Sequence, residues 1–163
     1  MIEAYAGLEF AGEFLEMYYG EESKAWSALG EVQRKALLVQ ATLAIDALGN
    51  VKRGFWGRKR DEGQARAFPR EGEEGISDRV MMACCLEAWA LADAQCRQRR
   101  RLRRQGVSAM AIGSASEQYM RFGLFGGNSR SNNKTDISQI IASEEAFGLM
   151  MEYLDLRGVY SIN

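Results

Sequence analysis

The feature that most constrains the fold is residues 77–104, a run of 28 residues without glycine or proline. Ser77 and Asp78 are typical of a helix N-terminus, because a serine side chain accepts a hydrogen bond from the first turn and an acid favours the positive end of the helix dipole. Apolar residues then recur at helical spacing on two faces, one of which is lined by small side chains. The run therefore predicts one long helix that packs on both sides.

Two shorter helices are predicted in the N-terminal third. Residues 8–18 have the spacing of an amphipathic helix with an acidic exposed face, and residues 31–48 follow Gly30, a suitable N-cap. The second helix carries two apolar stripes, one formed by Val32, Ala36, Val39, Leu43 and Ala47 and the other by Leu37, Ala41, Ala44, Ile45 and Leu48. A helix that is apolar on two sides lies either at the centre of its domain or between the core and a partner subunit, and we favour the central position.

A long loop is predicted over residues 49–76, which are rich in glycine and charge and contain the only proline, Pro69. Loops longer than about 15 residues usually carry a function. Three aromatic residues, Phe55, Trp56 and Phe68, are expected to anchor this loop. The loop and the helices around it form a predicted helical core over residues 1–105.

The C-terminal third is less regular in sequence. Residues 106–122 suggest a short β-hairpin, although a capping-box spacing at Ser114 leaves a short helix open. Residues 123–136 have the composition of a flexible linker. Residues 137–163 contain one more helix, at 137–156, which either reaches a neighbour as an arm or folds back on its own domain. The predicted fold class is mainly α: a small helical bundle with a short β-hairpin and an extended C-terminal helical arm.

Composition excludes several classes of protein. The chain has no histidine, and its three cysteines lie in an apolar helical pattern rather than in spaced pairs, which removes the usual zinc ligands and the usual proton carrier of acid–base catalysis. It also lacks a glycine-rich phosphate loop and a nucleophile elbow. We therefore expect no catalytic residues, no metal and no cofactor. Without a long apolar run or a secretory signal, we expect no membrane association and a location in the cytoplasm.

The strongest local signal is a set of six arginines among residues 97–104. One helical face carries the candidate contacts for phosphates or for a DNA channel, namely Arg97, Arg100, Arg101 and Arg104. Three interpretations remain open: a solvated end that complements the helix dipole, the lining of a passage for DNA, and pairing with acids of a neighbouring copy. Charge is segregated along the chain, because residues 1–51 carry 8 acids against 3 bases and residues 52–104 carry 8 against 14.

Several phrases of the sequence, taken together, resemble one protein family. They are Ala25-Trp26, the phrase KALLVQAT at 35–42, Trp56-Gly57, the phrase QARAFPR at 64–70, and Gly75-Ile76 before an alanine-rich helix. Over residues 1–120 this pattern is similar to the head-tail connector, or adaptor, family of tailed bacteriophages. Some members of that group carry the label DnaT-like single-stranded-DNA-binding protein.

The resemblance implies a structural protein of the virion neck, assembled in the host cytoplasm as a ring of twelve copies. The ring would attach to the portal protein and to a downstream neck or tail-completion protein, with double-stranded DNA passing through its channel without sequence specificity. Contacts between subunits or with the portal are expected from Trp56, Phe68, Pro69, Arg70, Phe147, Met150, Met151 and Leu154. The alternative is a module that binds single-stranded DNA.

Overall fold

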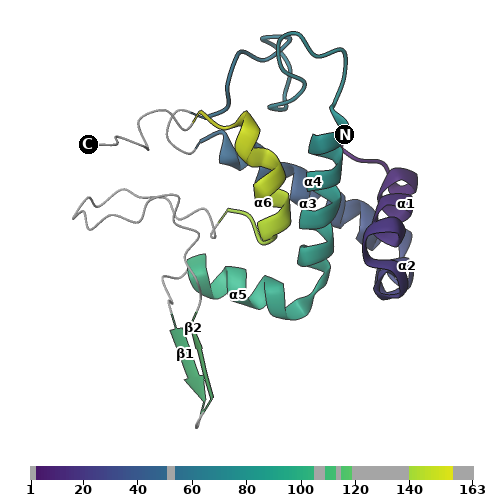
Figure 1. The fold of residues 1–163 in the computed structure, drawn as a ribbon, viewed down its shortest axis with the longest axis vertical. Helices are drawn as coiled ribbons and strands as arrows, with labels where there is room; N and C mark the ends of the chain where they lie inside the picture. The colour runs from purple at the N-terminus through teal and green to yellow at the C-terminus, as the bar shows by residue number, and fades with distance from the viewer. Residues whose placement is uncertain (1–2, 51–53, 105–108, 113–114, 119–139, 156–163) are drawn as a thin grey trace, which may run out of the picture.

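The computed structural model describes residues 3–50, 54–104, 109–112, 115–118 and 140–155. Its elements are α1 (Leu8–Tyr19), the 3-10 turn η1 (Gly20–Ser23), α2 (Lys24–Ser27), α3 (Glu31–Leu48), α4 (Asp78–Ala92), α5 (Ala94–Arg104), β1 (Ala109–Ile112), β2 (Ala115–Gln118), α6 (Glu144–Met150) and the 3-10 turn η3 (Met151–Tyr153). The protein is small and mainly α-helical (Figure 1). None of the helices in this part of the chain has the length and apolar character that a bilayer span requires.

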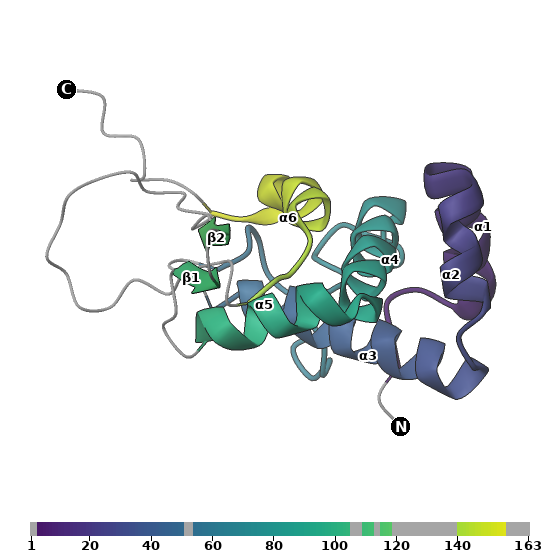
Figure 2. The same cartoon turned by 90° about the horizontal axis from the view of Figure 1, so that it is seen from below.

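Helix α4 is the central element, because α1, α3 and α6 all pack against it (Figures 1 and 2). Its contact with α3 is built from small and branched side chains, of which Ala41, Ile45, Cys84 and Ala88 have no exposed surface. Small residues bring the helix backbones close together, and the larger side chains fill the space on either side. The helices predicted at 8–18 and 31–48 are confirmed as α1 and α3.

The prediction that α3 lies at the centre of the domain is wrong. One of its two apolar stripes is buried as a core face, including Leu37, Ala41 and Leu48. The other stripe lies at the surface, where the exposed fraction is 82% for Val32 and 47% for Leu43. The reason is that α4 occupies the centre, so α3 covers only one side of it.

The helix predicted over 77–104 is in fact two helices, α4 and α5, which meet at Asp93. The backbone of Asp93 is extended, and its carboxylate accepts hydrogen bonds from the backbone nitrogens of Gln95 (2.9 Å) and Cys96 (3.3 Å). These bonds hold the pKa of Asp93 below its usual range. An aspartate that caps the amides following it ends one helix and begins the next, so α5 leaves α4 at an angle (Figure 1).

The C-terminal helix folds back onto its own domain, so the prediction of an extended arm is wrong for the described residues. Helix α6 begins after its N-cap Ser143, is much shorter than the predicted 137–156, and buries Phe147 against α4. The fully buried carboxylate of Glu87, on α4, accepts hydrogen bonds from the backbone nitrogens of Ala142 and Ser143 at 2.8–3.0 Å. Apolar burial and this carboxylate together dock the segment on its own domain.

The remaining segments connect these helices. Between α3 and α4 the described residues 54–77 form the predicted loop, and Phe68 anchors it with only 2% of its surface exposed. Strands β1 and β2 pair antiparallel, with Ala109 opposite Gln118. The predicted linker at 123–136 lies outside the described residues.

Candidate nucleic-acid interface

Helix α5 carries all six arginines of the predicted run and no acidic residue. Its side chains are exposed at Arg97 and Arg101 and half-buried at Arg99. The side chains of Arg100 and Arg104, which complete the predicted face, lie outside the described part of the structure. A dense row of like charges creates a positive potential that attracts polyanions, so α5 is the candidate surface for nucleic acid.

Arg97 also has a structural role. Its Nη1 donates hydrogen bonds to the carbonyl oxygens of Leu91 (2.7 Å) and Ala92 (3.0 Å). These oxygens belong to the last turn of α4, where helix carbonyls otherwise lack partners. A guanidinium has five N–H donors, so Arg97 keeps donors for a phosphate while α4 sets its position.

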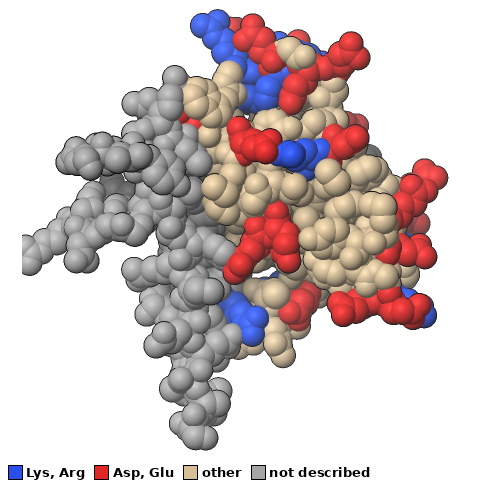
Figure 3. All heavy atoms as spheres, in the orientation of Figure 1, with Lys and Arg blue, Asp and Glu red and all other residues tan. Residues whose placement is uncertain are grey.

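One group of acidic residues lies on α1 and η1. Residues 8–23, which form α1 and η1, contain five glutamates and no basic residue. Red side chains accordingly line the side on which α1 and α2 lie, and others lie over the loop and near α6 (Figures 1 and 3). Helix α1 also exposes apolar surface, with exposed fractions of 78% for Met17 and 50% for Tyr18. The N-terminal helix is therefore acidic and α5 is basic, while acids and bases are mixed elsewhere on the surface.

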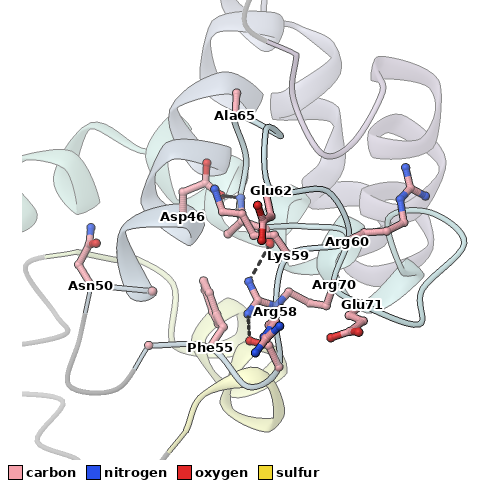
Figure 4. A pocket seen from close by; sticks show the side chains of 14 residues that line it. Asp46, Asn50, Phe55, Arg58, Lys59, Arg60, Glu62, Ala65, Arg70 and Glu71 are labelled. Atoms are coloured by element: carbon pink, nitrogen blue, oxygen red, sulfur yellow. Dashed lines mark hydrogen bonds between the residues drawn. The ribbon is translucent and has the colours of Figure 1, made fainter.

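A second group of basic side chains surrounds a cleft in the loop between α3 and α4. This open cleft, of about 790 Å³, lies between the loop and the C-terminal end of α3 (Figure 4). Its charged lining consists of Arg58, Lys59, Arg60, Arg70, Asp46, Glu62 and Glu71. Because acids are interleaved with the bases, the cleft carries much less net charge than α5.

Most of the cations at this cleft hold the loop together. Lys59 donates to the carbonyl oxygen of Gln64 (3.1 Å), and Arg60 donates to that of Glu74 (2.6 Å). Arg70 donates to three carbonyl oxygens of the loop, and its guanidinium lies 5.8 Å from the ring centre of Phe55. These contacts give the basic side chains of the loop a structural function.

Asp46 of α3 fastens the same loop to the core. It accepts hydrogen bonds from the backbone nitrogen of Ala67 (3.1 Å), from Arg66 Nη1 (3.1 Å) and from the hydroxyl of Tyr5. The Tyr5 hydroxyl in turn accepts a hydrogen bond from the backbone nitrogen of Phe68 (3.1 Å). Burial, and secondarily the Asp46 carboxylate, raise the pKa of Tyr5 above its usual range.

The predicted interface residues divide into a buried and an exposed group. Phe68, Phe147, Met150 and Leu154 are at most 7% exposed and belong to the core of the fold. That they contact another protein stays a prediction. Pro69 and Arg70 are half-buried in the loop. Trp56 and Met151 remain accessible, with exposed fractions of 41% and 36%.

Nothing in the described residues resembles a metal centre, since no three Cys, Asp or Glu side chains gather there. Cys84 and Cys85 are buried free thiols whose pKa values are raised by burial.

Three carboxylates that organise the structure were missed by sequence reasoning: Asp46, Glu87 and Asp93. A signal was present for Glu87, because this acid falls on the same helical face as the buried Cys84, Ala88 and Leu91. A buried carboxylate must accept hydrogen bonds from nearby donors, but the sequence does not show which segment supplies these donors.

The fold and this surface define a small, mainly helical protein with one strongly basic helix. The chain belongs to the family described as "Putative DnaT-like ssDNA binding protein", whose sequence model matches residues 1–143. None of the curated proteins and none of the solved structures compared with the chain matches it.

Proposed function

We propose that this protein binds single-stranded DNA without sequence specificity, with α5 as its phosphate contact. The observation that carries the proposal is the run of six arginines without an acid on α5. Its family description also names single-stranded DNA as the ligand. Arginines that meet phosphate oxygens hold a strand in place but do not read its bases, so affinity is expected to depend on charge rather than on sequence.

Salt dependence of binding tests this proposal. Fluorescence anisotropy with a labelled oligonucleotide, over a series of salt concentrations, gives a slope of log affinity against log salt of about −0.7 for each phosphate neutralised on a single strand. If three or four arginines touch one strand, the slope is about −2 to −3. The double variant Arg99→Gln, Arg101→Gln should bind more weakly and make this slope shallower by about 1.4.

A matched control uses two cations outside α5. The exposed Arg58 and the exposed Lys35 are changed to glutamine together, which removes the same charge from residues outside α5 and α2. This variant should keep the affinity and the salt slope of the wild type. The proposal is wrong if the wild type fails to bind at low salt, or if both double variants lose affinity equally.

We propose, as a second candidate, a head-tail adaptor ring that attaches to the portal and to a downstream neck protein and extends the DNA channel. It is favoured by the exposed apolar stripe on α3, where Val32 is 82% and Leu43 47% exposed. A ring needs contacts between unlike faces of neighbouring copies, and the acidic α1 and the basic α5 supply surfaces of opposite charge. In this arrangement the arginines of α5 would line the path of double-stranded DNA.

Oligomeric state and portal binding test the ring. Electron microscopy of the protein alone and mixed with a portal protein should show closed rings, which Val32→Glu combined with Leu43→Glu should abolish. Gln33→Glu combined with Gln40→Glu adds the same two charges at exposed polar positions of α3 and serves as the control. A monomer at high concentration without affinity for the portal would exclude this function.

A further inference from the structure

A groove of about 700 Å³ lies beside the first turns of α5, between α2, α4 and the segment that leads into α6. Its lining includes Tyr19, Leu29, Trp89, Ala92, Arg99 and Glu144. Two of these side chains form an aromatic pair, since the rings of Tyr19 and Trp89 stack with centres 4.9 Å apart and planes 22° apart. The groove therefore combines an apolar and aromatic lining with direct access to the arginine helix.

The charges around the groove differ from one wall to the other. Arg99 projects from α5 on one side, and Glu144 and Glu145 come from α6 on the other. Asp93 also lies on the lining, but its carboxylate already accepts the amides that begin α5. A phosphate is consequently attracted to the α5 wall and repelled by the α6 wall.

Tyr19, one of the lining residues, also carries a hydroxyl that can ionise. Burial, and then the neighbouring Glu145, raise the pKa of Tyr19 to about 12. The hydroxyl is thus neutral at physiological pH and adds no charge to the groove. Neutral aromatic and aliphatic side chains favour the flat, uncharged face of a nucleobase over a charged group.

We propose that this groove receives a base of a single-stranded nucleic acid whose phosphates lie along α5. The inference rests on the proposed binding of single-stranded DNA and adds a base subsite to it. Base–aromatic stacking tolerates any sequence, because every base has a π-face. A duplex keeps its bases paired and stacked inside, so the groove would also make the protein prefer single strands to duplexes of the same charge.

The test compares strands that differ only in their bases. One probe is a labelled strand of about 12 deoxycytidines, and the other is an abasic strand of the same length and charge. Wild-type protein should bind the strand with bases roughly 5- to 150-fold more tightly, which corresponds to the range for stacking of one base. Trp89→Leu should remove most of this preference and leave the salt dependence unchanged.

Two further variants keep the test decisive. Ala25 is exposed at the rim, so Ala25→Leu should narrow the groove without disturbing the core and should also remove the preference if Trp89→Leu does not fold. Trp56→Leu removes a tryptophan that is 41% exposed on the distant loop and should keep the preference.

The possible results separate the two proposals. Equal, salt-dependent binding of both probes by the wild type would overturn the base subsite and leave the phosphate contact standing. A base preference that survives Ala25→Leu and Trp89→Leu, or that disappears only in Trp56→Leu, would also overturn it. If neither probe binds at low salt, the proposed function itself is wrong.

Discussion

Glu87 should contribute more to the docking of the C-terminal segment than any single apolar contact there. Its carboxylate has no exposed surface and accepts hydrogen bonds from Ala142 N at both oxygens (3.0 and 2.8 Å) and from Ser143 N (2.8 Å). Two backbone donors therefore depend on one side chain. A hydrogen bond to a charged group contributes about 1.5–3 kcal/mol, and a buried donor left without a partner costs about 1–3 kcal/mol.

Two substitutions at Glu87 separate charge from hydrogen bonding. Glu87→Gln keeps one acceptor oxygen and loses the charge, so we expect a loss of about 1–2 kcal/mol of unfolding free energy. Glu87→Met keeps the length of the side chain but strips both amides of their acceptor. Removing a buried charge also relieves its desolvation cost, so the net loss should be about 2–4 kcal/mol, a large part of a typical total of about 5–15 kcal/mol.

Urea unfolding measures these losses as a lower midpoint at an unchanged slope. Hydrogen exchange of the Glu87 variants should show that the amides of Ala142, Ser143 and α6 lose protection before the amides of α3 do. The exposed Glu16 provides the control, since Glu16→Gln removes the same charge from the surface of α1. If Glu87→Met unfolds at the midpoint of the wild type, the carboxylate does not hold the segment.

Three other predictions concern titration and packing. The pKa values of Tyr5 and Tyr19 are raised, so the folded state favours the neutral form of both side chains. The stability that this gives should be fully present below the pKa of an unfolded tyrosine, about 10, and should fall as the pH rises to about 12. Circular dichroism across an alkaline titration measures this loss. Because burial raises the pKa of Cys84 and Cys85, a thiol reagent should label half-exposed Cys96 first in the native protein and the other two only on unfolding, as mass spectrometry of peptides would show. Tyr5→Phe removes the acceptor of the Phe68 amide and a donor to Asp46, so thermal unfolding should reveal a loss of about 1–3 kcal/mol, and equal stability would contradict that network.

Local signals in the sequence predicted the starts and faces of the helices well. Gly30 and Ser77 precede helices at the expected positions, and the buried face of α3 follows the 3.6-residue period of its apolar residues. These features depend on residues within one or two turns of each other, which is the range that periodicity and capping describe.

The packing of the helices against one another could not be predicted in the same way. The run without glycine or proline continues past Asp93, and only the geometry of the Asp93 carboxylate shows that the helix ends there. The back-folding of residues 140–155 depends on Glu87, more than 50 residues away in sequence. Likewise, the Val32 stripe of α3 is buried only if α3 occupies the centre of the domain. The presence of two apolar stripes is compatible with a central or a peripheral position of this helix.

The candidate site was predicted in part. The arginine run located α5, but its pairing with a groove required the turn at Asp93, which places Arg99 beside Trp89. Without that turn, α5 would continue along the axis of α4, and its arginines would lie farther from the last turns of α4. The aromatic pair could not be inferred from sequence, because Tyr19 and Trp89 belong to helices whose packing no local pattern specifies.

The two proposed functions use different parts of the surface, and this makes them separable in one set of variants. Strand binding depends on α5 and the groove that contains Trp89, whereas ring formation depends on the α3 stripe that contains Val32 and Leu43. A substitution in one region leaves the contacts of the other intact, and the free-energy effects of substitutions at distant sites are additive. If Val32→Glu combined with Leu43→Glu weakens DNA binding as much as Arg99→Gln combined with Arg101→Gln, the strand must be bound by an assembly of copies rather than by α5 of a single one.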